Sequence, residues 1–379
     1  MPDVLIVAGE PSGDALAGEL VRAASELRPD VRFFGATGPE LESAGAERVL
    51  PTSTLSTMGL TEVVGKLPAA LKALSTLERA AVERPAAGAI LVDSPDFNLR
   101  LARRLARRGV PVVQYVAPTV WAWRRGRTRA VRRYVRRLIV TLPFEAEGYR
   151  EAGVDAVYVG HPALDRIPRP LPARSEVAAR AGLPSGRRWV ALLPGSRAAE
   201  LERLGGPFAA AAARIAARVP DAAFLSPVAP GVDPERVAEA LTGGPAVALV
   251  QRGRHEVLAH CVAAVAASGT ASLELALLGV PHVVAYRVSA LTWGAARLLV
   301  RVDHVALPNL IAGKAIVPEF LQGAARAAAI AGPVLTWLAD EAARAEVVRE
   351  LTRVREAIGP PGVAGRAARE ALNALALAL

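Results

Sequence analysis

Residues 4–14 read VLIVAGEPSGD, an unbroken apolar run followed at once by a turn of glycine and polar residues. Continuous apolar runs are typical of parallel strands that helices cover on both faces. The glycines permit a tight turn, and Ser12 or Asp14 can cap the helix that follows. This stretch therefore predicts a strand, a turn and a helix, which together form the first unit of an α/β fold.

The same alternation of apolar runs and helical segments recurs along the 379 residues. Further predicted strands span 31–35, 89–92, 110–115, 138–142 and 156–159, and then 189–193, 222–226, 246–250, 263–267 and 281–286. The segment 161–188 between these groups is rich in Pro and Arg, which is typical of a linker. We predict a first domain over 1–165, a linker over 166–187, a second domain over 188–349 and a C-terminal helix over 350–379 that can return to the first domain. The fold class is α/β, with two Rossmann-like, doubly wound domains that face a central cleft and bind ligands at the carboxyl ends of their strands.

Composition excludes several classes of protein. Hydrophobic residues make up 52% of the chain and the mean hydropathy is +0.28, values that exclude intrinsic disorder. No apolar run approaches the ~20 residues of a membrane-spanning helix, and the first residues lack the pattern of a secretion signal. The single cysteine, Cys261, excludes a disulfide framework and a cysteine-based zinc site. We therefore expect a folded cytoplasmic protein.

The net charge of +10 is concentrated in one window. Residues 100–137 contain 13 arginines and no acid, whereas outside this window 33 basic residues face 36 acidic ones. Arg100, Arg103, Arg104, Arg107 and Arg108 would line one helix face. This pattern indicates anionic lipid headgroups, a phosphorylated substrate or nucleic acid, with a solvated face as the alternative. Aromatic residues are too few there for a base-stacking platform.

An apolar stretch over 58–71 carries only two charges. Its large apolar residues are Met58, Leu60, Val63, Val64, Leu67 and Leu71. Such a stretch can be ordinary core, or it can face lipid, since its glycines and Pro68 make it a poor long core helix.

Two carboxylates follow buried strands of the first domain. Glu10 comes after the strand at 4–8, and Asp93 ends the strand at 89–92. A carboxylate at such a place is unusual without a ligand or partner, and it can accept the proton of an attacking hydroxyl. Asp96 and Asn98 are more simply explained as caps of the next helix.

The second domain has two turns that could bind phosphate. Gly195, Ser196 and Arg197 follow one predicted strand, and Ser268, Gly269 and Thr270 follow another. Helix N-termini in such turns offer free N–H groups and a positive dipole end, and together the two turns favour a nucleotide diphosphate. Neither turn is a Walker A or GxGxxG motif. Glu274 could reach a sugar hydroxyl one turn into its helix.

Two further polar residues and the absence of metal motifs complete the candidate site. Asn309 and Gln322 could contact phosphate, uracil or sugar, although taken alone the pair is better explained by loop capping. The chain has no Asp-x-Asp motif and no Cys or His cluster. We expect no cofactor and no metal.

Taken together, these segments resemble the lipid-A-disaccharide synthase family of bacterial glycosyltransferases. The matching stretches are AGEPSGD, LSTMGLTEVVGKLP, VDSPDFN, APTVWAWR, LPFEAEGYREAGV, VGHP, LLPGSRAAELERL, ASGTASLELALLGVPHVVAYR and LPNLIAGKAIVPEFLQ, in order from residue 8 to residue 322. His282 takes a position that is often Met in the family.

The resemblance implies a GT-B fold that binds the acceptor mainly in the first domain and the nucleotide sugar mainly in the second. It implies inverting transfer of 2,3-diacylglucosamine from UDP-2,3-diacylglucosamine to 2,3-diacylglucosamine 1-phosphate, forming a β(1→6) disaccharide and UDP. Glu10, Ser12 and Asp93 match positions implicated in activity. Arg197, Asn309 and Gln322 match positions that handle donor or phosphate. The lipid substrates imply peripheral attachment to the anionic inner-membrane surface, with the apolar stretch and the arginine window as the contacts.

Two alternatives stay open at this point. Another UDP-sugar enzyme of the same fold, such as an N-acetylglucosaminyl transferase or a 2-epimerase, would share the turns of the second domain. A non-enzymatic nucleic-acid-binding protein would explain the arginine window. It would leave the two strand-end carboxylates and the two phosphate-type turns unexplained.

Overall fold

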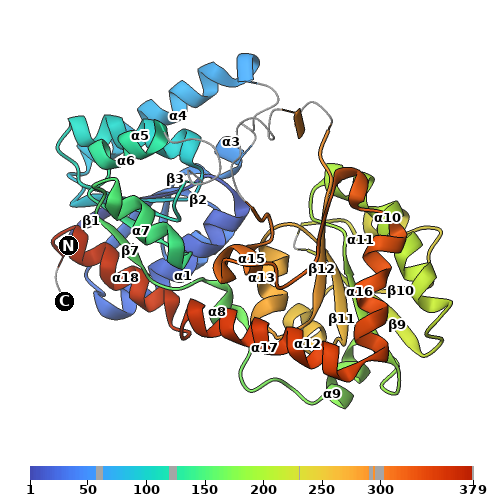
Figure 1. The fold of residues 1–379 in the computed structure, drawn as a ribbon. Helices are drawn as coiled ribbons and strands as arrows, with labels where there is room; N and C mark the ends of the chain where they lie inside the picture. Colours follow the sequence, from blue (N-terminus) through green and yellow to red (C-terminus); the bar gives the residue numbers. More distant parts are fainter. Residues whose placement is uncertain (57–62, 119–125, 230, 290–292, 295–302, 378–379) are drawn as a thin grey trace. The chain divides into compact units, whose positions relative to one another are not determined.

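Two parallel sheets organise the chain (Figure 1). The computed structural model describes residues 1–56, 63–118, 126–229, 231–289, 293–294 and 303–377. The chain divides into two units, one formed by residues 1–165 with 360–379 and the other by residues 166–359. Each unit has its own sheet and its own hydrophobic core.

The first unit contains a seven-stranded sheet in the order β3-β2-β1-β4-β5-β6-β7. Its strands are β1 (Asp3–Ala8), β2 (Arg32–Thr37), β3 (Glu47–Pro51), β4 (Gly88–Val92), β5 (Val112–Tyr115), β6 (Arg137–Val140) and β7 (Ala156–Tyr158). Every pair is parallel. The inner strands consist of fully buried apolar residues, as the continuous runs predict. The order reverses between β1 and β4, so this sheet has a topological switch point there.

Helices follow the strands of the first unit. They are α1 (Pro11–Leu27), α2 (Pro39–Ser43), α3 (Ser53–Ser56), α4 (Val63–Glu83), α5 (Pro95–Arg107), α6 (Gly126–Tyr134), α7 (Pro143–Glu151), α8 (Ala163–Arg166) and α18 (Val363–Ala374). Pro begins α1, α2, α5 and α7, where its missing N–H costs nothing and its fixed φ suits a helix.

The second unit repeats this plan with six strands in the order β10-β9-β8-β11-β12-β13. Its strands are β8 (Arg188–Leu193), β9 (Ala222–Pro227), β10 (Val247–Val250), β11 (Ala263–Ala267), β12 (His282–Tyr286) and β13 (Glu319–Leu321). Its helices are α9 (Arg174–Ala181), α10 (Ala198–Ala216), α11 (Pro234–Ala240), α12 (Arg254–Ala259), α13 (Thr270–Leu277), α15 (Leu307–Ala312), the 3₁₀ helix η1 (Gln322–Ala324), α16 (Ala327–Ala339) and α17 (Glu341–Ile358). The switch point of this sheet lies between β8 and β11.

The segment predicted as a linker packs into the second unit. Val177 and Leu183 lie in one core cluster with Trp189 of β8. The guanidinium of Arg174 stacks 4.0 Å from the centroid of the Trp189 ring and donates to the carbonyl of His260 at 2.7 Å. The apolar residues of α9 therefore give this Pro- and Arg-rich segment a fixed place in the core.

The C-terminal residues form two helices where the sequence suggested one. Gly359-Pro360-Pro361-Gly362 separates α17 from α18 because proline cannot continue a helix. Asp165 caps α18 by accepting from Gly362 N at 2.6 Å and from Ala364 N at 3.0 Å. Arg366 donates to Val159 O at 2.8 Å, so α18 belongs to the first unit and packs against α1.

Candidate active site

The residues predicted to hold the donor gather at the switch point of the second sheet. Residues after β8 and β11 lie side by side because these two strands are paired, with Leu193 opposite Ala266. A cavity of about 410 Å³ lies there. The candidate donor residues that line it are Gly195, Ser196, Arg197, Ser268, Gly269, Thr270 and Glu274. This is the place at which doubly wound sheets bind ligands.

The turn after β8 is closed by a carboxylate of its own helix. Glu200 Oε2 accepts from Ser196 N at 2.9 Å and from Arg197 N at 3.2 Å. Gly195 has φ 124°, and a Cβ there would lie 2.5 Å from the Glu200 side chain, so only glycine fits. The N–H groups predicted to hold phosphate are therefore occupied by Glu200, while the Arg197 side chain stays 80% exposed.

The turn after β11 is different. Gly269 is the N-cap of α13 and makes no side-chain cap bond, and no other side chain in the described part of the chain supplies one. Ser268, Gly269, Thr270 and Ala271 all line the cavity. Of the two phosphate-type turns, this one leaves the N-terminal N–H groups of its helix unclaimed by a side chain, which suits an anionic ligand.

Arg254 and His255 of α12 line the cavity and were missed from the sequence, as were Arg166 and Glu200. Arg254 Nε lies 2.9 Å from Glu274 Oε2, and His255 Nε2 lies 3.7 Å from the same oxygen. Burial raises the pKa of Glu274, but His255 and Arg254 more than offset this and leave that pKa below its ordinary value. Glu274 is thus an ionised carboxylate. The signal that could have revealed Arg254 is its place at the start of the helix that follows the predicted strand 246–250.

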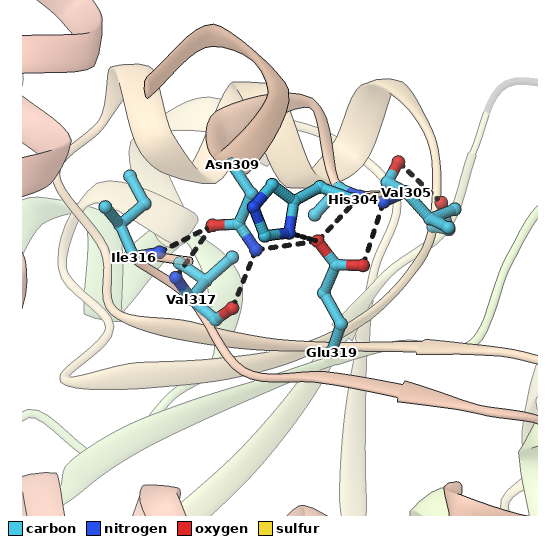
Figure 2. A network of polar contacts seen from close by, with 8 residues as sticks. His304, Val305, Asn309, Ile316, Val317 and Glu319 are labelled. Atoms are coloured by element: carbon cyan, nitrogen blue, oxygen red, sulfur yellow. Dashed lines mark hydrogen bonds and ion pairs between the residues drawn. The ribbon is translucent and has the colours of Figure 1, made fainter. Parts of the chain in front are cut away.

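Asn309 of α15 uses its whole side-chain amide to bond the segment 316–319 that leads into β13 (Figure 2). Its Oδ1 accepts from Ile316 N at 2.8 Å and Val317 N at 2.9 Å, and its Nδ2 donates to Val317 O at 2.9 Å and to Glu319 Oε1 at 2.6 Å. Glu319 also accepts from Val305 N at 2.8 Å. Since Ser268 Oγ contacts Val305 O at 3.5 Å, this network holds the loop beside the cavity. Asn309 therefore affects the donor site indirectly, through Glu319 and Val305.

Gln322 is a non-glycine residue with φ 50°. Its side-chain amide faces the backbone N–H and C=O of Val288, each at 3.2 Å in the orientation that satisfies both groups. Arg287 donates to the carbonyls of Gln322 at 3.2 Å and Ala325 at 2.6 Å. Gln322 therefore ties the end of β13 to the segment after β12, and it is not among the residues that line the 410 Å³ cavity.

The candidate catalytic residues lie at the switch point of the first sheet. Glu10 follows β1 and Asp93 follows β4, and these strands pair with Ala8 opposite Val92. Glu10 and Ser12 are exposed, and Ser12 lies in the first turn of α1. A Cβ on Gly9 would lie 2.1 Å from Ser94 Oγ, so glycine permits the two strand ends to approach closely.

Asp93 is the more buried of the two strand-end carboxylates. Burial raises the pKa of its carboxyl group above the ordinary value, while the Ser94 N–H acts in the opposite direction. A raised pKa brings a carboxylate closer to the range that suits a general base. Asp93 thus has the environment expected of a group that exchanges a proton.

The nearby polar residues have other roles than the predicted helix caps. Asp14 accepts from Gly38 N at 2.7 Å and Glu40 N at 2.9 Å, so it caps α2 and not its own helix. Asn98 donates to the carbonyls of Val92 and Asp93. Asp96 pairs with Arg127 of α6. Asn98 thus holds the carbonyls at the end of β4, and Asp96 links α5 to α6.

Comparison with known proteins identifies the family. A family model described as lipid-A-disaccharide synthetase matches residues 4–361. A lipid-A-disaccharide synthase of Anaeromyxobacter dehalogenans (strain 2CP-1) is 45% identical over 374 residues, which cover 98% of this chain and 97% of the relative. The chain belongs to the lipid-A-disaccharide synthase family. The synthase of Myxococcus xanthus is 44% identical over 375 residues, covering 99% of this chain and 98% of its own.

Solved structures place this member of the lipid-A-disaccharide synthase family in the GT-B fold. The calicheamicin glycosyltransferase CalG4 matches with a TM-score of 0.63 at 20% identity, over 99% of this chain and 98% of that chain. The S. aureus MnaA–UDP co-structure matches with a TM-score of 0.68 at 12% identity, over 100% and 98%. These likenesses confirm the predicted pair of Rossmann-like folds.

The described residues include only some of the predicted lipid contacts of this family member. Met58 and Leu60 lie outside the described residues, as do Trp121 and Trp123 of the WAWR motif. Val63, Val64 and Leu67 belong to α4, and the structure describes only their backbone. Leu71 of the same helix is 46% exposed. Among the described residues no helix is long and apolar enough to cross a membrane.

The arginine window is less uniformly basic in the fold than in the sequence. Glu78 of α4 pairs with Arg104 at 3.3 Å and with Arg108 at 2.9 Å. Arg137 pairs with Asp155 at 3.0 Å and with Glu370 at 2.5 Å. Acids distant in the sequence therefore neutralise part of the window.

His282 is a buried neutral histidine. Its Nε2 lies 3.0 Å from Ser272 Oγ and its Nδ1 lies 2.8 Å from Val280 O, so Nδ1 carries the proton and Nε2 accepts. Burial lowers its pKa to about 4. A methionine at this position would make neither bond.

We expect this histidine to make stability depend on pH. An unfolded histidine binds a proton near pH 6.5, whereas the folded one resists it down to about pH 4. Stability is therefore fully present above pH 6.5, and up to about 3 kcal/mol is lost as the pH falls to 4. Urea unfolding across this range should show that component in the wild type and in Ser272→Ala, but not in His282→Met. Parallel curves for wild type and His282→Met would contradict the assignment.

Proposed function

We propose that this chain transfers 2,3-diacylglucosamine from UDP-2,3-diacylglucosamine to the 6-hydroxyl of 2,3-diacylglucosamine 1-phosphate. The observation that carries the proposal is the family match over residues 4–361. The cavity at the second switch point supports it because predicted donor residues line it. The products are the β(1→6) disaccharide 1-phosphate and UDP.

In the proposed reaction the acceptor oxygen O6 attacks C1 of the donor sugar from the side opposite UDP. The O6–C1 bond forms, the bond from C1 to the diphosphate oxygen breaks, and the configuration at C1 inverts. Asp93 takes the proton of the 6-hydroxyl, which requires its carboxylate to be ionised and within hydrogen-bond reach. Glu10, at the paired strand end, is the rival base. Ser12, in the first turn of α1, would contact the acceptor.

The departing UDP gains negative charge, and the second unit supplies the groups that would stabilise this charge. The uncapped N-terminus of α13 and the exposed Arg197 would hold the diphosphate. Glu274, ionised and fixed by Arg254, would accept a hydrogen bond from a ribose hydroxyl. Asn309 and Gln322 would act by holding the adjoining segments in place.

The proposed reaction uses no metal. Within the described parts of the chain, no three His, Cys, Asp or Glu residues are grouped to hold an ion. The proposal rests on the cations and the helix end named above, which can stabilise a diphosphate leaving group by themselves.

Mass spectrometry with both lipid substrates tests the function. We expect a disaccharide 1-phosphate and one UDP for each product molecule. Conversion of UDP-N-acetylglucosamine to its 2-epimer would favour the epimerase alternative, and tight binding to duplex DNA at moderate salt without turnover would favour the nucleic-acid alternative.

We also propose that the enzyme attaches peripherally to the anionic cytoplasmic leaflet. Acylated substrates prefer a bilayer to water, so the acceptor site has to meet the membrane surface. Support comes from α4, where Leu71 is 46% exposed, and from Arg104 of α5 and its C-cap Arg108, which bond to Glu78 of α4 and so lie beside that helix. An apolar surface flanked by arginines is typical of interfacial binding.

Leu71→Glu is expected to weaken binding to anionic vesicles by about tenfold, since it removes a half-buried apolar contact and adds a like charge to the lipid. Val82→Glu is the matched control, because Val82 is 50% exposed on the same helix and about 16 Å farther along it. Vesicle cosedimentation at two salt concentrations measures both variants. Equal loss in the two variants, or binding that ignores salt and lipid charge, would contradict the proposed surface.

A further inference from the structure

Two neighbouring strand ends of the first unit have left-handed backbone at residues other than glycine. Asp93 has φ 52° and Ser94 has φ 41°, directly after β4. Val116 has φ 68°, directly after β5. Such conformations are sparsely populated, above all for a β-branched residue, and they persist only where the surroundings impose them.

One buried amide contacts both strand ends. Gln114 lies in β5 opposite Leu91 of β4 and is fully buried. Its Nε2 lies 3.2 Å from Asp93 O, 3.3 Å from Val116 O and 3.4 Å from Tyr115 O. The donor group of Gln114 is therefore shared among the carbonyls that the left-handed turns direct toward it.

Asn98 contributes a second donor to the same peptide. It is fully buried in α5, and its Nδ2 lies 2.7 Å from Asp93 O and 3.1 Å from Val92 O. The carbonyl of Asp93 thus accepts from two side chains, and its own N–H donates to Tyr115 O at 2.9 Å. The peptide groups on either side of Asp93 are fixed, and so is the direction in which its side chain leaves the backbone.

The acceptor atoms of these two amides are buried without a hydrogen-bond partner among the described residues. They are Asn98 Oδ1 and Gln114 Oε1. A buried polar atom without a partner destabilises the fold, and an apolar side chain of the same size would avoid that cost. The amides are therefore best explained by what their N–H groups hold.

We propose that Gln114, together with Asn98, is a positioning residue for the reaction: it holds the strained peptide after β4 so that the Asp93 carboxylate faces the acceptor hydroxyl. The proposal rests on the proposed function, in which Asp93 is the base. Gln114 itself touches no reacting atom. It acts through the carbonyl of Asp93, and a small shift of a base away from its proton is enough to slow a reaction by about a hundredfold.

Gln114→Met tests this role, because methionine keeps the size of the side chain and removes the donors. We expect kcat to fall by about 10- to 100-fold with the Kd for UDP unchanged, since the cavity of the second unit is untouched. We also expect the acid limb of the kcat/KM profile to move to lower pH, because a loosened turn admits water and lowers the raised pKa of Asp93. Among the described residues, the titratable groups on the segments that adjoin Asp93 are Glu10 and Asp14 at the start of α1, Tyr115 at the end of β5, and Asp96 in the first turn of α5, which pairs with Arg127.

Val113→Ala is the matched control, since Val113 is the preceding residue of β5, equally buried and on the opposite face of the sheet. It should lower the free energy of unfolding and leave kcat and the acid limb in place. If Gln114→Met behaves in the same way as Val113→Ala, the proposal is wrong. Should Gln114→Met fail to fold, Asn98→Leu removes the other donor and must show the same fall in kcat and the same shift.

The double variant separates this inference from the proposed function. If Gln114 acts through Asp93, its loss adds little to the defect of Asp93→Asn, because a base that is absent needs no positioning. Full multiplication of the two defects overturns the positioning role and leaves Asp93 as the base. An active Asp93→Asn enzyme overturns the base assignment itself, and the role proposed for Gln114 with it.

Discussion

Asp93→Asn is expected to lower kcat by about 10²- to 10⁴-fold while the Kd for UDP stays nearly unchanged. Asparagine keeps the size of the side chain but cannot take the proton of the 6-hydroxyl. In the wild type, kcat/KM should fall on the acid side as Asp93 becomes protonated. That limb should lie above the range of an ordinary aspartate, because burial raises the pKa of this carboxyl group. Steady-state kinetics from pH 4 to pH 8 and calorimetric titration with UDP measure both effects.

Glu10→Gln is the comparison that decides between the two strand-end carboxylates. Glu10 is exposed, and its strand is paired with that of Asp93. If Glu10→Gln loses more activity than Asp93→Asn and also removes the acid limb, the roles are reversed.

Arg197→Ala is expected to lower kcat by about 10²- to 10³-fold, because the charge that develops on the departing diphosphate would lose a donor. The side chain of Arg197 is 80% exposed and lies 3.4 Å from Glu200, so it is free to turn toward a ligand in the cavity. Its removal should barely change the free energy of unfolding, since exposed ion pairs contribute little. Single-turnover kinetics and thermal unfolding measure the two quantities.

Arg203→Ala is the matched control on the same helix, at a position that does not line the cavity. It should retain the wild-type kcat. Equal losses in Arg197→Ala and Arg203→Ala would show that general charge, and not the place of Arg197 at the cavity, matters for turnover.

The inner strands were predictable because burial on both faces leaves a continuous apolar run in the sequence. The edge strands β3 and β13 were not predicted. Glu47 and Arg48 of β3 are exposed, and β13 has only three residues, all partly buried. These two edge strands lack a neighbour on one side and carry no continuous apolar pattern, so their pairing depends on the sheet that receives them. The other two edge strands, β7 and β10, do carry short apolar runs and were predicted.

The candidate site shows the same division. Glu10 with Asp93 and Gly195 with Ser268 were expected together because the carboxyl ends of parallel strands meet at one edge, a rule that needs only strand positions. The ion pairs of the arginine window with Glu78 and Glu370 were not predicted, because these pairs join residues that are far apart in the chain.

The sequence by itself determined the two α/β folds, the family and the strand ends proposed to carry the chemistry, because apolar period and turn residues are local properties. Only the tertiary structure decided how the polar groups there are used. In the structure the N–H groups of Ser196 and Arg197 donate to Glu200, and Arg254 donates to Glu274. The amide of Gln114 donates to the carbonyl of Asp93 in its left-handed turn. Each such bond needs two groups within about 3 Å, and packing, not sequence spacing, sets that distance.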